Sequence, residues 1–255
     1  MSRLTGKTAL VTGSSRGIGR ATAIRLGREG ALVAVHYAAN TGAAEETVAL
    51  IEKDGGQAFA VQAELGVPGD VHTLFLGLEQ QLKDRTGETT LDILVNNAGE
   101  TTATGIPFEE VTGAVFDRFF AVNARAPFFL VQRAMAHLPA GGRIINISSG
   151  LTRVANPDQI PYAMTKGAIE QLTLHLARLL ASRGITVNTV APGITDNGGP
   201  VFDIPEAVEQ MASLSAFNRV GQTGDVADVI TFLATDEARW ITGAFLDATG
   251  GTLLG

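Results

Sequence analysis

Short apolar runs alternate with longer amphipathic segments along the whole chain, and this alternation limits the possible folds more than any other feature. Most of the short runs are continuous and rich in β-branched residues, as in strands that are covered on both faces. The predicted strands are Thr8–Thr12, Leu32–Tyr37, Ala58–Ala63, Leu91–Asn96, Arg143–Ser148, Thr186–Val190 and Ala244–Ala248. Helical patterns lie between them, one marked by an apolar stripe of Ile169, Leu172, Leu176 and Leu179. The alternation predicts an α/β fold, a doubly wound parallel sheet of about seven strands with helices on both faces.

The composition narrows the class of protein. The chain has 255 residues, of which 45% are hydrophobic, and no linker-like stretch divides it, so we expect a single domain over residues 1–255. A formal charge of −7 argues against a nucleic-acid partner, whose phosphates need clustered lysines and arginines. The absence of cysteine excludes disulfides and thiolate chemistry. Without a signal-like start or an apolar run of about 18 residues, the chain is expected in the cytoplasm and away from membranes.

The segment Thr12–Gly19 follows the first predicted strand and opens a helix that runs to about Gly30. In its pattern G-x-x-x-G-x-G, Gly13 permits a tight turn, Gly17 a close backbone approach and Gly19 the packing of helix on strand. The helix N-terminus offers unpaired amides and the positive end of a dipole to a pyrophosphate. The segment predicts a Rossmann-type dinucleotide site at the carboxyl ends of the strands. An ordinary glycine-rich connection is the alternative.

The second predicted strand distinguishes between the two nicotinamide dinucleotides. NAD sites commonly end this strand with an acid for the ribose 2′-hydroxyl, about 20 residues after the glycines. Here the strand ends in Tyr37 and Ala38, and no acid follows before Glu45. Arg16 lies in the glycine turn, where its guanidinium can pair with a 2′-phosphate. These residues favour NADP(H) over NAD(H), unless Arg16 is simply a solvated residue of the turn.

Tyr162 and Lys166 lie at the start of a predicted helix, and a separation of four residues puts both side chains on one face. An ordinary tyrosine titrates near pH 10, too high for efficient proton transfer at neutral pH. A nearby ammonium stabilises the phenolate, so we expect Lys166 to lower the pKa of Tyr162. Ser149 ends the fifth predicted strand and is a candidate donor to a substrate carbonyl.

Together these motifs resemble the short-chain dehydrogenase/reductase family over essentially the whole chain. The resemblance rests on the order and spacing of Thr12–Gly19, Asn96-Asn97-Ala98-Gly99, Asn123, Ser149, Tyr162, Lys166, Pro192-Gly193 and Gly250-Gly251. It implies an oxidoreductase that uses NADP(H) to interconvert a ketone and a secondary alcohol in a small-molecule substrate. It also implies a homotetramer, packed through the long helices around Asn123 and Tyr162 and through the C-terminal strand.

The resemblance implies catalytic roles for four residues. Tyr162 would exchange a proton with the substrate oxygen while hydride moves to or from the nicotinamide. Lys166 would hold the nicotinamide ribose, Ser149 would polarise the carbonyl, and Asn123 would hold a water for proton relay. The neighbouring Ser148 is the weaker candidate, because Ser149 has the family spacing to Tyr162.

Cofactor contacts are expected over a larger set of residues. They are Gly13, Ser15, Arg16, Gly17, Ile18, Gly19, Tyr37, Ala38, Glu64, Leu65, Asn97, Ala98, Gly99, Tyr162, Lys166, Pro192, Gly193 and Thr195. Glu64 departs from the family pattern, since an aspartate commonly contacts the adenine there. Asn197 stands where a threonine often contacts the cofactor, so Thr195 is a substitute for that contact. No metal is expected, because the four histidines lack paired ligand spacing.

The segment from Ile194 to about Ala216 is expected to close over the nicotinamide as a mobile, partly apolar lid. Leu151, Ile160 and the stretch Glu100–Thr104 are the other expected walls of the substrate pocket. Family likeness favours a 3-oxoacyl-[acyl-carrier-protein] reductase, although the acidic chain shows no sequence cluster of basic residues for an acidic carrier. Other small ketones, such as sugar, steroid or xenobiotic carbonyls, fit nearly as well.

Two further functions stay open. An epimerase or dehydratase would share the Tyr-x-x-x-Lys motif, but such chains usually carry an added substrate domain for which 255 residues leave little room. A non-catalytic NADP-binding regulatory protein would be expected to have lost catalytic residues, whereas all four expected ones are present.

Overall fold

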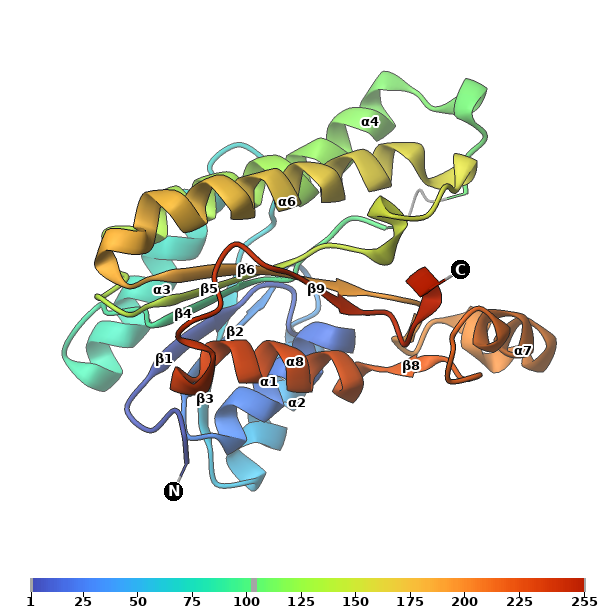
Figure 1. Cartoon of the computed structure of the whole chain (residues 1–255). Coiled ribbons are helices and arrows are strands. Elements are labelled where there is room, and N and C mark those ends of the chain that lie inside the picture. Colours follow the sequence, from blue (N-terminus) through green and yellow to red (C-terminus); the bar gives the residue numbers. More distant parts are fainter. Residues whose placement is uncertain (1, 102–104, 255) are drawn as a thin grey trace.

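The computed structural model describes residues 2–101 and 105–254, and its centre is a seven-stranded parallel sheet (Figure 1). The strand order is β3-β2-β1-β4-β5-β6-β9, which confirms the predicted doubly wound α/β fold. The strands are β1 Thr8–Val11, β2 Leu32–Tyr37, β3 Gln57–Gln62, β4 Ile93–Asn96, β5 Arg143–Ile147, β6 Thr186–Pro192 and β9 Phe245–Ala248. Each predicted strand is present, with ends that differ by no more than about two residues, the usual scatter of strand boundaries.

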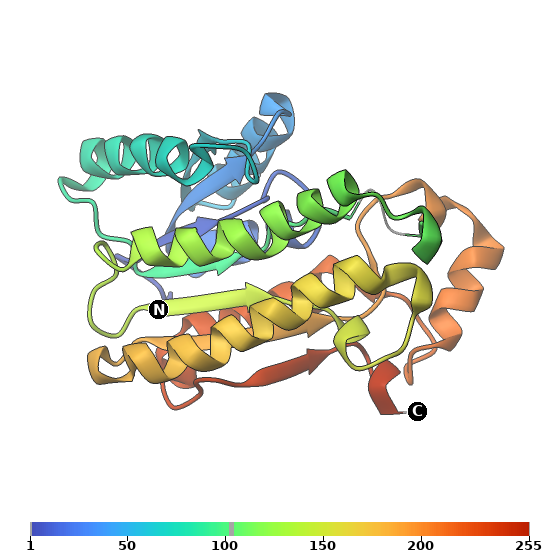
Figure 2. The ribbon, with the colours of Figure 1, turned by 90° about the horizontal axis from the view of Figure 1, so that it is seen from above.

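Two layers of helices cover the sheet (Figures 1 and 2). One face carries α1 Gly17–Arg28, α2 Thr41–Lys53 and α8 Thr223–Ala234, whose buried side chains join one apolar core. The other face carries α3 Asp70–Thr86, α4 Gly113–Phe120, α5 Ala126–Ala134 and α6 Ile160–Leu180. Buried side chains of α3, α5 and α6 form a second core there. None of the helices in the described ranges is long and apolar enough to cross a membrane.

The buried face of α6 differs from the predicted leucine stripe. Ile169 is buried as predicted, but Leu179 is 63% exposed, and the helix instead turns small and threonine side chains to the sheet. Thr173 shows why: its hydroxyl donates to the Ile169 carbonyl and accepts from Asn146 on β5 and Thr189 on β6. A buried asparagine in the sheet needs such a partner, so polar threonine replaces leucine at this contact.

A pair of short strands that the sequence did not predict ties the two ends of the lid together. Strands β7 Thr195–Asp196 and β8 Gly221–Gln222 form a separate parallel ladder. Between them lies α7 Pro205–Ser213, which projects beyond the ends of the main sheet (Figure 1). The predicted lid therefore starts at a short parallel ladder, and its mobility stays a prediction.

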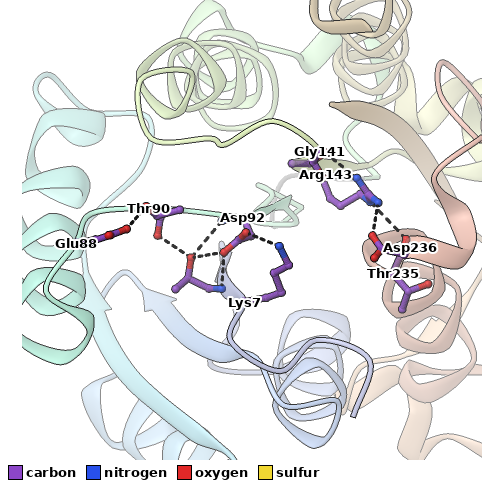
Figure 3. Close-up of polar contacts among 10 residues, drawn as sticks. Lys7, Glu88, Thr90, Asp92, Gly141, Arg143, Thr235 and Asp236 are labelled. Carbon is purple, nitrogen blue, oxygen red and sulfur yellow. Dashed lines mark hydrogen bonds and ion pairs between the residues drawn. The ribbon is translucent and has the colours of Figure 1, made fainter. Parts of the chain in front are cut away.

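Polar side chains secure the opposite, amino-terminal edge of the sheet (Figure 3). The Asp92 carboxylate accepts from the Thr8 backbone amide and from Lys7 Nζ, both at 3.0 Å. Arg143 begins β5 and is buried, and its guanidinium donates to the carbonyls of Gly141 and Thr235 and to the carboxylate of Asp236. These contacts fix the ends of β1, β4 and β5 and leave the carboxyl edge for the site.

Candidate active site

A cavity of about 430 Å³ lies at the carboxyl ends of the central strands. Every residue predicted to contact the cofactor lines it, and so does Ser149. Their contact with a bound cofactor stays a prediction. The lining also includes residues that the sequence did not single out as site residues, among them His36, Arg118 and Val122. Leu151 and Ile160 are not part of this lining, and Thr102–Thr104 lie outside the described residues.

The glycine turn is shaped for a close approach of backbone to ligand. Gly13 and Gly17 have positive φ angles of 65° and 58°, a region that favours glycine. A Cβ atom on Gly19 would lie 2.4 Å from the Gly13 carbonyl oxygen, so only glycine lets α1 start this close to the turn. Helix α1 has no side-chain cap and no acid in its first turn. Gly17, Ile18 and Gly19 at its start line the cavity, and an uncapped helix N-terminus there fits a pyrophosphate.

His36 holds this turn from the neighbouring strand and is a residue that sequence reasoning missed. Its Nδ1 accepts from the Gly13 amide at 2.9 Å, and its Nε2 lies 3.0 Å from the Ala63 carbonyl oxygen. The two contacts assign the neutral tautomer with the proton on Nε2. Burial lowers the pKa of His36 to about 4, so this form persists at neutral pH. The only signal in the sequence is a histidine inside an otherwise apolar strand.

Arg16 lines the same cavity as Tyr37 and Ala38. The Arg16 side chain is exposed and, within the described ranges, makes no hydrogen bond or ion pair. Arg20, by contrast, donates to the Ser15 carbonyl and pairs with Glu46 at 2.8 Å. Arg16 is therefore the guanidinium that remains for a 2′-phosphate.

Tyr162, Lys166 and Ser149 converge at the other end of the cavity. The Lys166 Nζ lies 5.4 Å from the centre of the Tyr162 ring and donates to the Ile147 carbonyl at 2.9 Å. Burial lowers the pKa of Lys166 to about 8. Burial also raises the pKa of Tyr162 to about 12, opposed by a hydrogen bond with Ser149. The expected fall in the pKa of Tyr162 is therefore not seen in this structure, because desolvation of the phenolate raises that pKa.

Ser148 and Ser149 have different partners, which separates their roles. The Ser148 hydroxyl is buried and donates to the Glu170 carboxylate at 2.7 Å. The Ser149 hydroxyl oxygen accepts from the Leu151 amide at 3.2 Å, and its hydroxyl also hydrogen-bonds Tyr162 inside the cavity. Ser149 is thus the serine equipped to donate to a substrate oxygen, as its spacing to Tyr162 suggested.

Asn123 lies beside the cavity rather than in its lining. It sits in a π-helical turn, Ala121–Arg125, between α4 and α5, and is buried. Its side chain donates to the Glu100 carbonyl and to the Thr165 hydroxyl and accepts from the Glu100 amide. These bonds fasten the segment after β4 to α6. The predicted water relay stays a prediction.

Glu64 and Asn197, which depart from the family pattern, both line the cavity. Glu64 and Glu100 each lie 3.5 Å from the Arg118 guanidinium, so this arginine on α4 links two sides of the cavity. The Thr195 hydroxyl donates to the Gly193 carbonyl at 3.1 Å. A Cβ atom on Gly17 would lie 3.5 Å from Asn197, which shows that the base of the lid packs beside the glycine turn.

A parallel sheet with a glycine turn at its switch point, in one cavity with a half-buried tyrosine and a buried lysine, is typical of nicotinamide-dependent oxidoreductases. A family model described as Enoyl-(Acyl carrier protein) reductase matches residues 13–252. Versicolorin reductase stcU of Emericella nidulans is 41% identical over 262 residues, covering 98% of this chain and 96% of the relative. Tetrahydroxynaphthalene reductase of Pyricularia oryzae is 39% identical, covering 98% and 91%. The chain belongs to the short-chain dehydrogenase/reductase family, and it is an oxidoreductase acting on carbonyl and alcohol groups.

Two solved structures are more similar still. The promiscuous reductase LugOII, which catalyses keto-reduction at C1 during lugdunomycin biosynthesis, is 75% identical with a TM-score of 0.98. The alignment covers 99% of this chain and 100% of LugOII. The angucycline C-6 ketoreductase LanV, solved with bound NADP, is 65% identical with a TM-score of 0.97, covering 100% of this chain and 98% of LanV.

Proposed function

We propose that this protein is an NADPH-dependent ketoreductase whose substrate is a fused-ring, partly aromatic ketone. The observation that carries the proposal is that Ser149, Tyr162 and Lys166 line the same cavity as the glycine turn and Arg16. The similar proteins LugOII, LanV and tetrahydroxynaphthalene reductase are reductases by their names, and LanV binds NADP. Arg16 and the absence of an acid after Tyr37 support the same cofactor here.

The protonation states of Tyr162 and Lys166 suit the transfer of a proton to a ketone oxygen. NADPH supplies a hydride to the carbonyl carbon when it is bound. Ser149 and Tyr162 both donate to the carbonyl oxygen, which develops negative charge, and Tyr162 gives up its proton to form the alcohol. Because the pKa of Tyr162 is raised to about 12, the phenol is fully protonated at neutral pH and ready to donate. The pKa of Lys166 is lower, at about 8, so return of a proton from its ammonium to the phenolate is favourable.

The exposed apolar side chains of the lid favour an apolar substrate. It begins at the cavity with Thr195, and its side chains Val201, Ile204 and Leu214 are exposed despite being apolar. Val154, in the turn that follows Ser149, is also exposed. Exposed apolar side chains around a site are typical of surfaces that bind apolar ligands. The net charge of −7 disfavours an acidic carrier protein as the docking partner.

We also propose that the chain forms a homotetramer in the cytoplasm. Phe128 and Phe129 on α5 and Leu174 and Leu179 on α6 are exposed apolar side chains on the helices expected at subunit contacts. Light scattering at micromolar concentration tests the assembly, and a monomer would contradict it.

The test of the function is NADPH oxidation by the purified chain, followed by absorbance with three ketones. These are a tetralone, an acetoacetyl thioester and a simple aliphatic ketone, each repeated with NADH. Preferential turnover of the tetralone with NADPH supports the proposal, whereas preference for the thioester would instead indicate an acyl reductase. Tyr162→Phe should bind NADPH normally and lose at least about 100-fold in kcat, since it removes the proton donor. Near-normal kcat in a folded Tyr162→Phe variant would refute the mechanism.

A further inference from the structure

One carboxylate outside the expected catalytic set binds the chain on both sides of Ser149. Glu170 lies on α6, and its side chain is 12% exposed. One of its oxygens accepts from the Ser148 hydroxyl at 2.7 Å. The other lies 2.9 Å from Nη1 of Arg153. The Arg153 guanidinium also stacks 4.3 Å from the centre of the Phe245 ring on β9, which fixes its direction.

The segment between these two anchors is a compact turn. Ser149 is the N-cap of a short 3-10 helix, Gly150–Thr152. Within it the Thr152 hydroxyl donates to the Ser149 carbonyl at 3.0 Å, and the Arg153 amide donates to the Gly150 carbonyl at 2.9 Å. These bonds hold the turn together. Ser148 and Arg153, which flank it, both bind the Glu170 carboxylate.

Glu170 also shares a helix with two side chains of the expected catalytic set. Tyr162, Lys166 and Glu170 are spaced by four residues, so they form one row along α6. The row faces the end of β5, since Lys166 donates to the Ile147 carbonyl and Glu170 accepts from Ser148. Ser149 follows directly, so its position relative to Tyr162 is set by these two contacts between helix and strand.

We propose that Glu170 is a positioning residue for the ketone reduction proposed above: by binding Ser148 and Arg153 together, it holds the Ser149 hydroxyl in register with the Tyr162 hydroxyl. Catalysis of this kind depends on both donors meeting one oxygen, and a misplacement of about 1 Å can cost about 100-fold in rate. Arg153 is 48% exposed and Glu170 12%, so a cost to folding is measured separately from the effect on turnover. We expect the main effect of Glu170 on turnover.

The test compares Glu170→Ala and Glu170→Gln with wild type in the full chain, using NADPH and the best ketone found for the wild type. We expect kcat of Glu170→Ala to fall about 10- to 100-fold, while NADPH binding, measured by fluorescence titration, stays unchanged. Glu170→Gln should fall less, because it keeps an oxygen for Ser148 but no charge for Arg153. Ser148→Ala and Arg153→Ala each release one anchor and should each cost less than Glu170→Ala.

Glu79→Ala is the matched control. Glu79 also bridges two groups, Arg133 at 2.7 Å and His137 at 3.1 Å, but it lies on α3 away from Ser149. Its variant should keep full kcat. Equal kcat in the Glu170 and Glu79 variants would overturn the proposal, and so would parallel losses of kcat, NADPH binding and folded fraction. If the wild type reduces no ketone, the proposed function fails instead. Crystal structures of wild type and Glu170→Ala then decide: a longer Ser149–Tyr162 hydroxyl separation supports positioning, and an unchanged one refutes it.

Discussion

Protonation of His36 should destabilise the fold in mild acid, because both of its ring nitrogens are committed to the neutral tautomer. A proton on Nδ1 would face the Gly13 amide, turning a hydrogen bond of 2.9 Å into two opposed donors. Burial places the folded pKa at about 4, against the ordinary value of 6.5. The unfolded chain thus takes up this proton first, so the contribution to stability is complete above pH 6.5 and is lost as the pH falls towards 4.

The magnitude follows from the two pKa values. The difference of 2.5 between 6.5 and 4 corresponds to about 3 kcal/mol when the loss is complete, and to about 2 kcal/mol at pH 5. The assay is urea unfolding at pH 7.5 and pH 5, followed by circular dichroism because Trp240 is 96% exposed and a poor reporter of folding. Wild type should lose about 2 kcal/mol more than His36→Gln, which cannot titrate.

His72→Gln serves as the control, since His72 is an exposed histidine on α3. Its loss of stability between the two pH values should match that of wild type. Equal losses in wild type and His36→Gln would refute the assignment of the neutral histidine at the glycine turn.

Three further predictions concern the site and its scaffold. The rate of ketone reduction should fall as the pH rises through about 8, because the Lys166 ammonium loses its proton there, and Lys166→Met should abolish this limb of the kcat profile. Arg16→Ala should raise KM for NADPH about 10-fold and leave KM for NADH nearly unchanged, since only NADPH carries the 2′-phosphate; equal changes would contradict that role. Arg143→Met should lower the free energy of unfolding by about 2–4 kcal/mol, because it removes the donor of buried carbonyls. Asp236 is 93% exposed, so Asp236→Asn should cost less than about 1 kcal/mol. Urea unfolding measures both.

Much of the fold and of the reacting set could be predicted because each rests on local patterns. Continuous β-branched runs separated by amphipathic segments identify buried parallel strands, and every predicted strand is present. The glycine turn and the pair Tyr162 and Lys166 follow from short spacings, since the turn needs residues without Cβ and the pair needs one helical face. Chemistry that depends on neighbours in sequence is visible in sequence.

The remainder depends on contacts between distant segments. His36 gains its role from Gly13 and Ala63, which only the alignment of β1, β2 and β3 brings to its two nitrogens. Thr173 on α6 faces the sheet because its hydroxyl accepts a hydrogen bond from the buried Asn146 side chain. The raised pKa of Tyr162 cannot be read from sequence, because desolvation depends on how deeply the phenol is enclosed.

Burial shifts the pKa values of Tyr162 and Lys166 in opposite directions, and this sets which protonation state each has at neutral pH. Desolvation disfavours phenolate and ammonium alike, so it raises the pKa of Tyr162 to about 12 and lowers that of Lys166 to about 8. At pH 7 the phenol keeps its proton, and reduction starts from the form already present. Oxidation of the alcohol would first need the phenolate, which at pH 7 lies about 7 kcal/mol uphill from a phenol of pKa about 12. The proton donor that ketone reduction needs is therefore the form of Tyr162 present at neutral pH.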